Sequence, residues 1–238
     1  PFKKLVHQGM ILGSNGIKMG KRFPEFVVNP SDIVRDYGAD TLRTYEMFIG
    51  AFDLSASWSE DGVKGCRRFL ERVWKLQDIL VDGDAYSADM EVKMHQTIKK
   101  VSNDFESLKY NTAIAAMMAL INDFYKKNAV TKGEFKTLLT LLNPVAPHIT
   151  EELWNANGYE GRVYQATWPV YEEAKTQEAT VEIAVQVNGK TRLTIGIDKA
   201  EEKDAVIAKA KEALGDKITG TIVKEIYVPG RIVNIVCK

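Results

Sequence analysis

The spacing of apolar residues between about positions 63 and 172 constrains the fold more than any other feature. Phe69, Val73, Leu76 and Leu80 follow one another at intervals of four, three and four. Similar spacing recurs in residues 94–108, 111–124 and 134–142, and it places apolar side chains on one face of a helix. The last segment starts at Thr131-x-x-Glu134, a capping box, and stops before the prolines of NPVAP. Four amphipathic helices with short connections predict a helical bundle.

The pattern changes at about residue 176, where the chain becomes rich in β-branched residues. The runs TVEIAVQV and KTRLTIGI flank Asn188-Gly189, the residue pair that a type I′ hairpin turn prefers. A helical segment over about 201–214 follows, and the runs TIVKEIYV and RIVNIV then meet at Pro229-Gly230. This order predicts a small β-β-α-β-β module, joined to the bundle by the polar stretch 172–178.

The first 62 residues have mixed character, with short apolar runs, several glycines and one clear helix start. Asn29-Pro30-Ser31-Asp32 offers a capping residue, either Asn29 or Ser31, with Pro30 at the helix entry. The predicted fold class is therefore α+β and multidomain. Its three domains are residues 1–62, 63–172 and 173–238.

The composition argues against several classes of binding partner. Lys plus Arg and Asp plus Glu number 32 each, so an anionic partner has to be held by local basic patches. Apolar runs stay well short of the ~20 residues of a membrane span, and we expect no membrane partner. The cysteines, Cys66 and Cys237, lack metal-ligand spacing, which predicts free thiols in a reducing cytoplasm and no metal site.

Two groups of basic residues are candidates for function. Lys18, Gly20, Lys21 and Arg22 form a glycine-containing loop whose ammonium groups could neutralise phosphate charge. A plain basic surface turn explains this loop equally well. The other group lies on the helix that begins near residue 63, where Lys64, Arg68, Arg72 and Lys75 form one stripe, with Arg67 beside it. Taken alone, that stripe is better explained as a solvated helix face.

His148 is a weaker candidate. It precedes Glu151 and Glu152 in PHITEELW, a spacing that places these side chains on one face of a helix. Because no second histidine is nearby, a packed and hydrogen-bonded histidine is the better interpretation.

Longer stretches of the chain resemble the class I aminoacyl-tRNA synthetases of the leucine, isoleucine, valine and methionine group. In that family a Lys-Met-Ser-Lys-Ser loop precedes a helix ending in Tyr-Gly-Ala-Asp-x-x-Arg, and Lys18–Arg22 and Tyr37–Arg43 match both. FLERVWKL, NTAIAAMMALIN and LLNPVAPHITEELW resemble the family's anticodon-binding bundle. VQVNGKTR and VPGRIVNIV resemble the C-terminal module of the bacterial leucine members.

The resemblance implies ATP-dependent attachment of leucine to tRNA(Leu) through a leucyl-adenylate, in a monomeric cytoplasmic enzyme. It assigns Lys21 to the ATP phosphates, which carry Mg²⁺, with Lys18 in support and Gly20 and Arg22 in the same loop. It also implies tRNA contacts by Arg67, Arg68, Arg72, Lys75, Lys190 and Arg231. Gly20 and Arg22 depart from the family, which has serines at both positions, and FPEF replaces the usual Arg-Gly-Asn.

The family's His-Ile-Gly-His motif is missing, because His7, His95 and His148 are the only histidines and none has that context. We therefore predict that this chain alone does not activate leucine and holds no tightly bound cofactor. Three alternatives stay open: an RNA-binding module without catalysis, the same region of a valyl- or isoleucyl-tRNA synthetase, and a scaffold whose resemblance reflects only ancestry.

Overall fold

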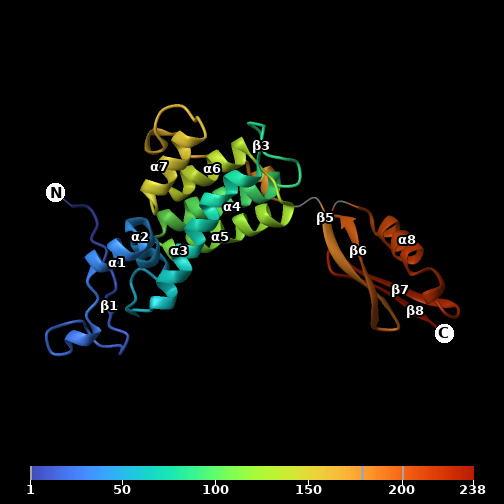
Figure 1. The fold of residues 1–238 in the computed structure, drawn as a ribbon. Helices are drawn as coiled ribbons and strands as arrows, with labels where there is room; N and C mark the ends of the chain where they lie inside the picture. Colours follow the sequence, from blue (N-terminus) through green and yellow to red (C-terminus); the bar gives the residue numbers. More distant parts are fainter. Residues whose placement is uncertain (1, 178–179, 200) are drawn as a thin grey trace. The chain divides into compact units, whose positions relative to one another are not determined.

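The computed structural model describes residues 2–177, 180–199 and 201–238, which form two compact units (Figure 1). The first unit comprises residues 1–176 and the second residues 177–238. Each unit is described by itself below. The proposed division of the first unit at residue 62 stays a prediction, and that position lies inside a continuous helix, α3 (Glu60–Lys75).

The first unit begins with a small layer of short elements. Strand β1 (Ile11–Leu12) pairs in parallel with β2 (Ala56–Ser57), and between them lie the 3-10 helix η1 (Pro24–Phe26), α1 (Pro30–Tyr37) and α2 (Ala39–Phe48). The Asn29 side chain caps α1 by accepting from the amide of Ser31 at 3.1 Å. Gly38, with φ of 91°, separates α1 from α2. A buried cluster built around Tyr45, Trp58 and Val63 joins these elements to α3.

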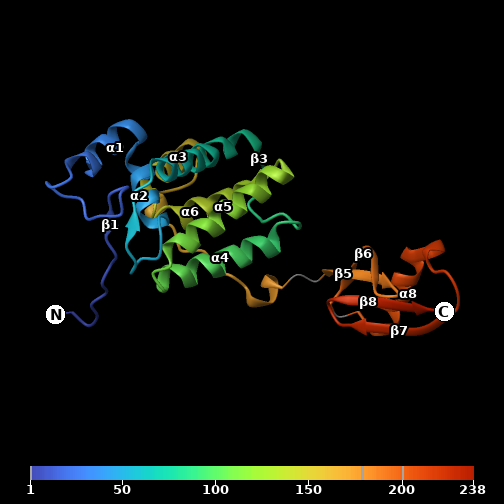
Figure 2. The same cartoon turned by 90° about the horizontal axis from the view of Figure 1, so that it is seen from below.

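The helical bundle makes up the rest of this unit (Figures 1 and 2). Its helices are α3, α4 (Glu91–Glu106), α5 (Tyr110–Lys127), α6 (Lys132–Leu142) and α7 (Pro147–Ala156). The predicted capping box is present, because Thr131 and Glu134 each accept from the other's backbone amide.

The described residues of the bundle form five α-helices in place of the predicted four. The segment after NPVAP starts a helix of its own because Pro147 occupies the first turn, where its missing N–H costs nothing.

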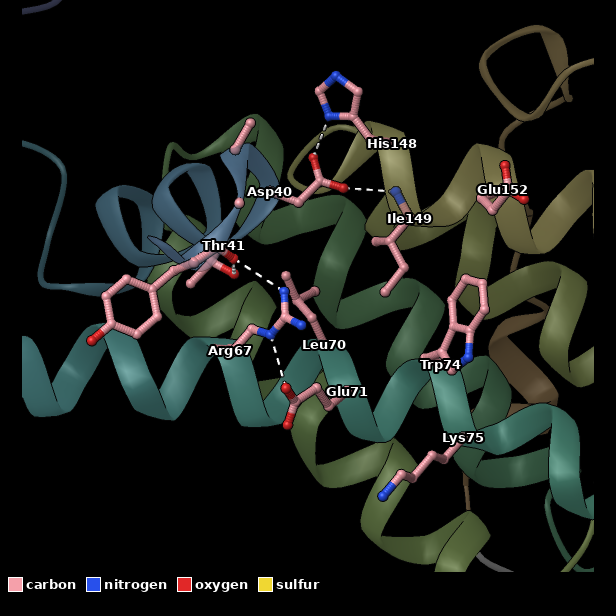
Figure 3. Close-up of a pocket in the computed structure, with 13 residues that line it drawn as sticks. Asp40, Thr41, Arg67, Leu70, Glu71, Trp74, Lys75, His148, Ile149 and Glu152 are labelled. Carbon is pink, nitrogen blue, oxygen red and sulfur yellow. Dashed lines mark hydrogen bonds and ion pairs between the residues drawn. The ribbon is translucent and has the colours of Figure 1, made fainter. Parts of the chain in front are cut away.

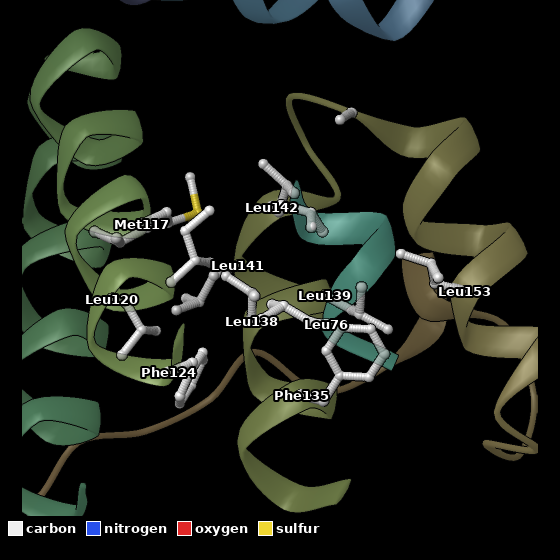
Figure 4. Close-up of a cluster of buried hydrophobic side chains, with 14 of the residues drawn as sticks. Leu76, Met117, Leu120, Phe124, Phe135, Leu138, Leu139, Leu141, Leu142 and Leu153 are labelled. Atoms are coloured by element: carbon white, nitrogen blue, oxygen red, sulfur yellow. The ribbon is translucent and has the colours of Figure 1, made fainter. Parts of the chain in front are cut away.

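Aliphatic, methionine and aromatic side chains fill the bundle core (Figure 4). Met117, Leu120 and Phe124 on α5 face Leu138 and Leu141 on α6, and all of them are fully buried. Two short parallel strands, β3 (Leu80–Val81) and β4 (Val130–Thr131), and three 3-10 helices, η2 (Leu76–Ile79), η3 (Val163–Gln165) and η4 (Glu173–Thr176), complete the unit.

The predicted linker, residues 172–178, is partly ordered against the bundle. Glu173 pairs with Lys99 of α4 at 2.6 Å, and Gln96 donates to the carbonyl of Thr176 at 2.9 Å. Residues 173–176 thus belong to the first unit, while residues 178 and 179 lie outside the described residues.

The second unit has the predicted β-β-α-β-β order. Strands β5 (Thr180–Val187) and β6 (Lys190–Asp198) precede α8 (Lys203–Leu214) and η5 (Gly215–Lys217), and β7 (Ile222–Val228) and β8 (Ile232–Cys237) follow. The sheet order is β6-β5-β8-β7, with β5 and β8 parallel at the centre. Asn188 and Gly189 have φ of 50° and 80°, which agrees with the predicted type I′ turn. Apolar side chains of α8 and of one sheet face share a core, so the fold class predicted from the sequence is confirmed.

Candidate functional site

Two partly buried side chains, Met19 and Val28, pack the basic loop of residues 13–29 against the rest of the first unit. The backbone turns at Gly13–Ile17, where the Gly13 amide donates to the Ile17 carbonyl at 2.9 Å. Met19 packs against the cluster around Tyr45 and Trp58, and its sulfur accepts from the Val28 amide at 3.4 Å. The basic character of the loop directs attention to its lysines, whereas the apolar Met19 between them is the residue that packs inward.

The basic side chains of the loop remain exposed on both sides of Met19. In the described residues, Lys18, Lys21 and Arg22 make no ion pair, and the Arg22 guanidinium lies 5.4 Å from the centre of the Phe23 ring. Three cations close in sequence with no bound carboxylate can accept an anionic ligand without first breaking an interaction. The structure therefore places all three predicted loop cations where a phosphate could reach them.

Gly20 has no structural requirement for glycine. Its φ lies outside the left-handed region, and a Cβ atom built there meets nothing within 4 Å. A serine, which the class I synthetases resembled by this loop carry at the same position, would therefore fit the loop without strain.

The basic residues of α3 divide among three environments. Arg67 donates to Glu71 at 2.8 Å and to the Tyr37 carbonyl at 3.1 Å, so its guanidinium is held in place. Arg72 lies over the Tyr125 ring of α5, 4.8 Å from its centre. Arg68 and Lys75 are exposed and make no ion pair within the described parts of the chain. Of the four predicted RNA contacts on this helix, these two are free to bind a phosphate.

A pocket of about 620 Å³ lies between α3, α7 and the junction of α1 and α2 (Figure 3). Leu70 and Ile149 supply apolar surface, and Trp74 stands beside them from α3. Arg67 and Lys75 from the predicted set belong to its lining, as do His148 and Glu152 of α7.

Asp40 attaches α2 to the start of α7. One carboxylate oxygen accepts from the Ile149 amide at 2.7 Å, and the other bonds His148 Nδ1 at 2.7 Å. Asp40 is 8% exposed. It therefore caps a helix more than a hundred residues away in the chain, where an acidic group also favours the positive end of the helix dipole.

Arg43, about one helical turn after Asp40 in α2, also holds α2 to the segment just before α7. Its guanidinium donates to the carbonyls of Pro144 and Val145 at 3.0 and 3.1 Å. The Tyr-Gly-Ala-Asp-x-x-Arg motif was the available signal, but the sequence alone does not reveal its partners. His148 is hydrogen-bonded, as predicted, yet 73% of its side chain is exposed, so it is not packed in the bundle.

The second unit places Lys190 and Arg231 far apart. Lys190 pairs with Val187 beside the β5–β6 turn, level with Ile235, whereas Arg231 precedes β8. Ile235 and Arg231 are four residues apart along the chain, which is about 13 Å at 3.3 Å per residue of extended strand. The two predicted contacts of this unit therefore lie at opposite ends of β8.

Within the described ranges, no three His, Cys, Asp or Glu side chains gather as metal ligands would. In the same ranges, no helix has the length and apolarity needed to cross a membrane.

Comparisons with known protein families match much of the first unit and extend into the second. The anticodon-binding domain of tRNA ligases matches residues 88–207, and the class I tRNA synthetases of the I, L, M and V group match residues 1–52. Leucine–tRNA ligase of Alkaliphilus oremlandii (strain OhILAs) is 56% identical over an alignment 241 residues long, which covers 100% of this chain and 30% of the relative.

A solved structure agrees with this relation. The chain aligns with the ternary complex of Agrobacterium radiobacter K84 LeuRS, tRNA and LeuAMS at a TM-score of 0.70 and 30% identity, covering 96% of this chain and 32% of the solved one. The chain thus spans about a third of the length of both relatives. It belongs to the class I tRNA synthetase family, carries that family's anticodon-binding domain, and matches leucyl-tRNA synthetases along its whole length.

Proposed function

We propose that this chain is the part of a leucyl-tRNA synthetase that supplies a phosphate-binding loop and tRNA-binding surfaces. The whole enzyme would attach leucine to tRNA(Leu), using ATP and passing through a leucyl-adenylate. The observation that carries the proposal is the 56% identity to a leucine–tRNA ligase over the entire chain. Lys18 and Lys21, exposed on either side of the anchored Met19, support it.

In this proposal Lys21 binds the ATP phosphates, and Lys18 and Arg22 add positive charge beside them. Charge builds up on phosphate oxygens as pyrophosphate leaves, and cations already in place stabilise it without reorganisation. The residues fit this task because none of the three loop cations is committed to a carboxylate in the described structure. Mg²⁺ would arrive with the nucleotide, since it is commonly bound through substrate phosphates and water.

The same proposal assigns tRNA binding to the basic residues of α3 and of the second unit. Arg68 and Lys75 offer free charge, Arg67 and Arg72 are held in defined positions, and Lys190 and Arg231 mark two separate contact points. We also propose a monomeric enzyme located in the cytoplasm. For the isolated chain, we propose RNA binding without leucine activation.

The test of the loop uses the full-length enzyme and leucine-dependent exchange of pyrophosphate into ATP. We expect Lys21→Ala to slow this exchange by about 100-fold or more, the usual cost of losing a group that stabilises transition-state charge. Lys126→Ala is the matched control, because Lys126 is an exposed lysine of α5 without an ion pair in the described residues. Unchanged exchange in Lys21→Ala would favour the scaffold alternative.

The test of the isolated chain uses a tRNA(Leu) transcript. Binding should weaken steeply between roughly 50 and 200 mM salt, because each phosphate contact releases counterions. Leucine-dependent exchange by the isolated chain, or transcript binding indifferent to salt, would contradict the proposal.

A further inference from the structure

Trp74 is the most exposed tryptophan of the first unit, and its ring contributes to an open pocket. It is 42% exposed, whereas Trp58 and Trp154 are 8% and 1% exposed. The ring lies beside the apolar side chains of Leu70 and Ile149 in the pocket of about 620 Å³ (Figure 3). That volume falls within the roughly 300–1,000 Å³ of typical ligand pockets. A flat aromatic wall in such a hollow is suited to a flat, apolar ligand group.

Cations that could hold a phosphate backbone lie next to this pocket on the same helix. Arg68 and Lys75 point outward from α3 without ion pairs in the described structure. At about 100° per residue, they lie on the same outward face of α3, about 10 Å apart along the helix axis, and Trp74 lies on the flank toward α7. Single-stranded RNA has the matching pattern, because its bases stack on aromatic rings while its phosphates follow neighbouring basic residues.

One free acidic side chain in the pocket lining favours a particular class of base. Both oxygens of Asp40 are engaged by α7, and the guanidinium of Arg67 is held by Tyr37 and Glu71. Glu152 of α7 also lines the pocket, and its carboxylate has no hydrogen-bond or ion-pair partner among the described residues. An ionised carboxylate only accepts hydrogen bonds, so it favours a base that presents an amino group.

We propose that the pocket formed by Trp74, Leu70, Ile149 and Glu152 binds one unstacked, amino-bearing nucleobase of an RNA whose phosphates lie along α3. The base stacks on Trp74 and donates from its amino group to Glu152. This inference rests on the proposed RNA binding and adds to it a specific base-binding site.

The experiment measures binding of a tRNA(Leu) transcript to this chain and to four variants. Trp74→Ala should weaken binding by about 5- to 140-fold, the usual value of one base stacked on an aromatic ring. Trp74→Phe keeps a ring and should stay within a few-fold of the parent. Tyr164→Ala removes an aromatic side chain that is 69% exposed and lies outside the pocket lining, so its affinity should not change. Glu152→Gln should weaken binding, because the amide presents its carbonyl oxygen as a weaker acceptor.

Fluorescence of the same proteins separates the base-binding site from general RNA binding. The transcript should quench the parent's tryptophan emission, and this quenching should be largely lost in Trp74→Phe. Salt-dependent binding with equal affinity for Trp74→Ala and no difference in quenching would overturn the base-binding site while leaving the proposed function intact. Absence of transcript binding by the parent chain would overturn both. Unchanged unfolding midpoints in the variants would show that altered binding does not come from misfolding.

Discussion

Replacing Asp40 tests whether the carboxylate holds the start of α7. The bond to the Ile149 amide joins an ionised acceptor to a helix N-terminus, at a residue that is only 8% exposed. Loss of a helix cap costs about 0.5–2 kcal/mol, and hydrogen bonds to charged groups contribute about 1.5–3 kcal/mol. The pair with His148 adds about 0–1 kcal/mol, because that imidazole is 73% exposed. We therefore expect Asp40→Ala to lower the free energy of unfolding by about 2–3 kcal/mol.

Asp40→Asn should cost about 1 kcal/mol, because an amide oxygen can still accept from the Ile149 amide but carries no charge. His148→Ala should cost less than about 1 kcal/mol, since it removes only the exposed partner. The matched control is Asp36→Ala, which breaks an ion pair with Arg35 whose two side chains are 51% and 67% exposed. Its effect should stay below about 0.5 kcal/mol.

Urea unfolding followed by tryptophan fluorescence measures these changes. Trp58, Trp74, Trp154 and Trp168 are the four tryptophans, and all lie in residues 1–176. The signal therefore reports on the unit that contains Asp40 and is not mixed with unfolding of the second unit. If Asp40→Ala costs no more than Asp36→Ala, or if His148→Ala costs as much as Asp40→Ala, the capping argument fails.

Two further predictions concern thiols and the basic loop. Burial raises the pKa of the Cys66 thiol to about 11, so a thiol reagent at pH 8 should label the half-buried Cys237 and spare Cys66 until the chain unfolds. Two rapidly reacting thiols in the folded protein would contradict this labelling pattern. The raised pKa also favours the protonated native form, so the free energy of unfolding should fall as pH rises from about 9 to about 11. Gly20→Ser should leave the free energy of unfolding within about 0.5 kcal/mol of the parent, because a Cβ there meets nothing within 4 Å. A loss above about 1 kcal/mol would show that the loop needs glycine.

The sequence predicts the elements of this protein well because local interactions determine them. Apolar spacing locates the first four helices of the bundle, and the Thr131–Glu134 capping box fixes the start of α6. Asn188-Gly189 specifies its turn because both residues adopt positive φ. Pro147 carries a similar local signal, because a proline both ends a preceding helix and suits the first turn of the next one, α7.

The arrangement of charges was much harder to predict, because it depends on partners distant in the chain. Asp40 meets Ile149 only after α2 packs against the bundle. Arg72 meets Tyr125 through the contact between α3 and α5. By contrast, the pairing of Arg67 with Glu71 was readable, since the two residues are one helical turn apart.

The attachment of the basic loop through Met19 has a consequence for how the loop can move. The methionine side chain has three rotatable bonds and fills irregular apolar gaps. Its sulfur can stay in the cluster around Tyr45 and Trp58 while the backbone that carries Lys18 and Lys21 shifts outside. The packing of Met19 thus holds the loop to the first unit without fixing the positions of Lys18 and Lys21. The two lysines can approach a ligand together while Met19 stays in the cluster.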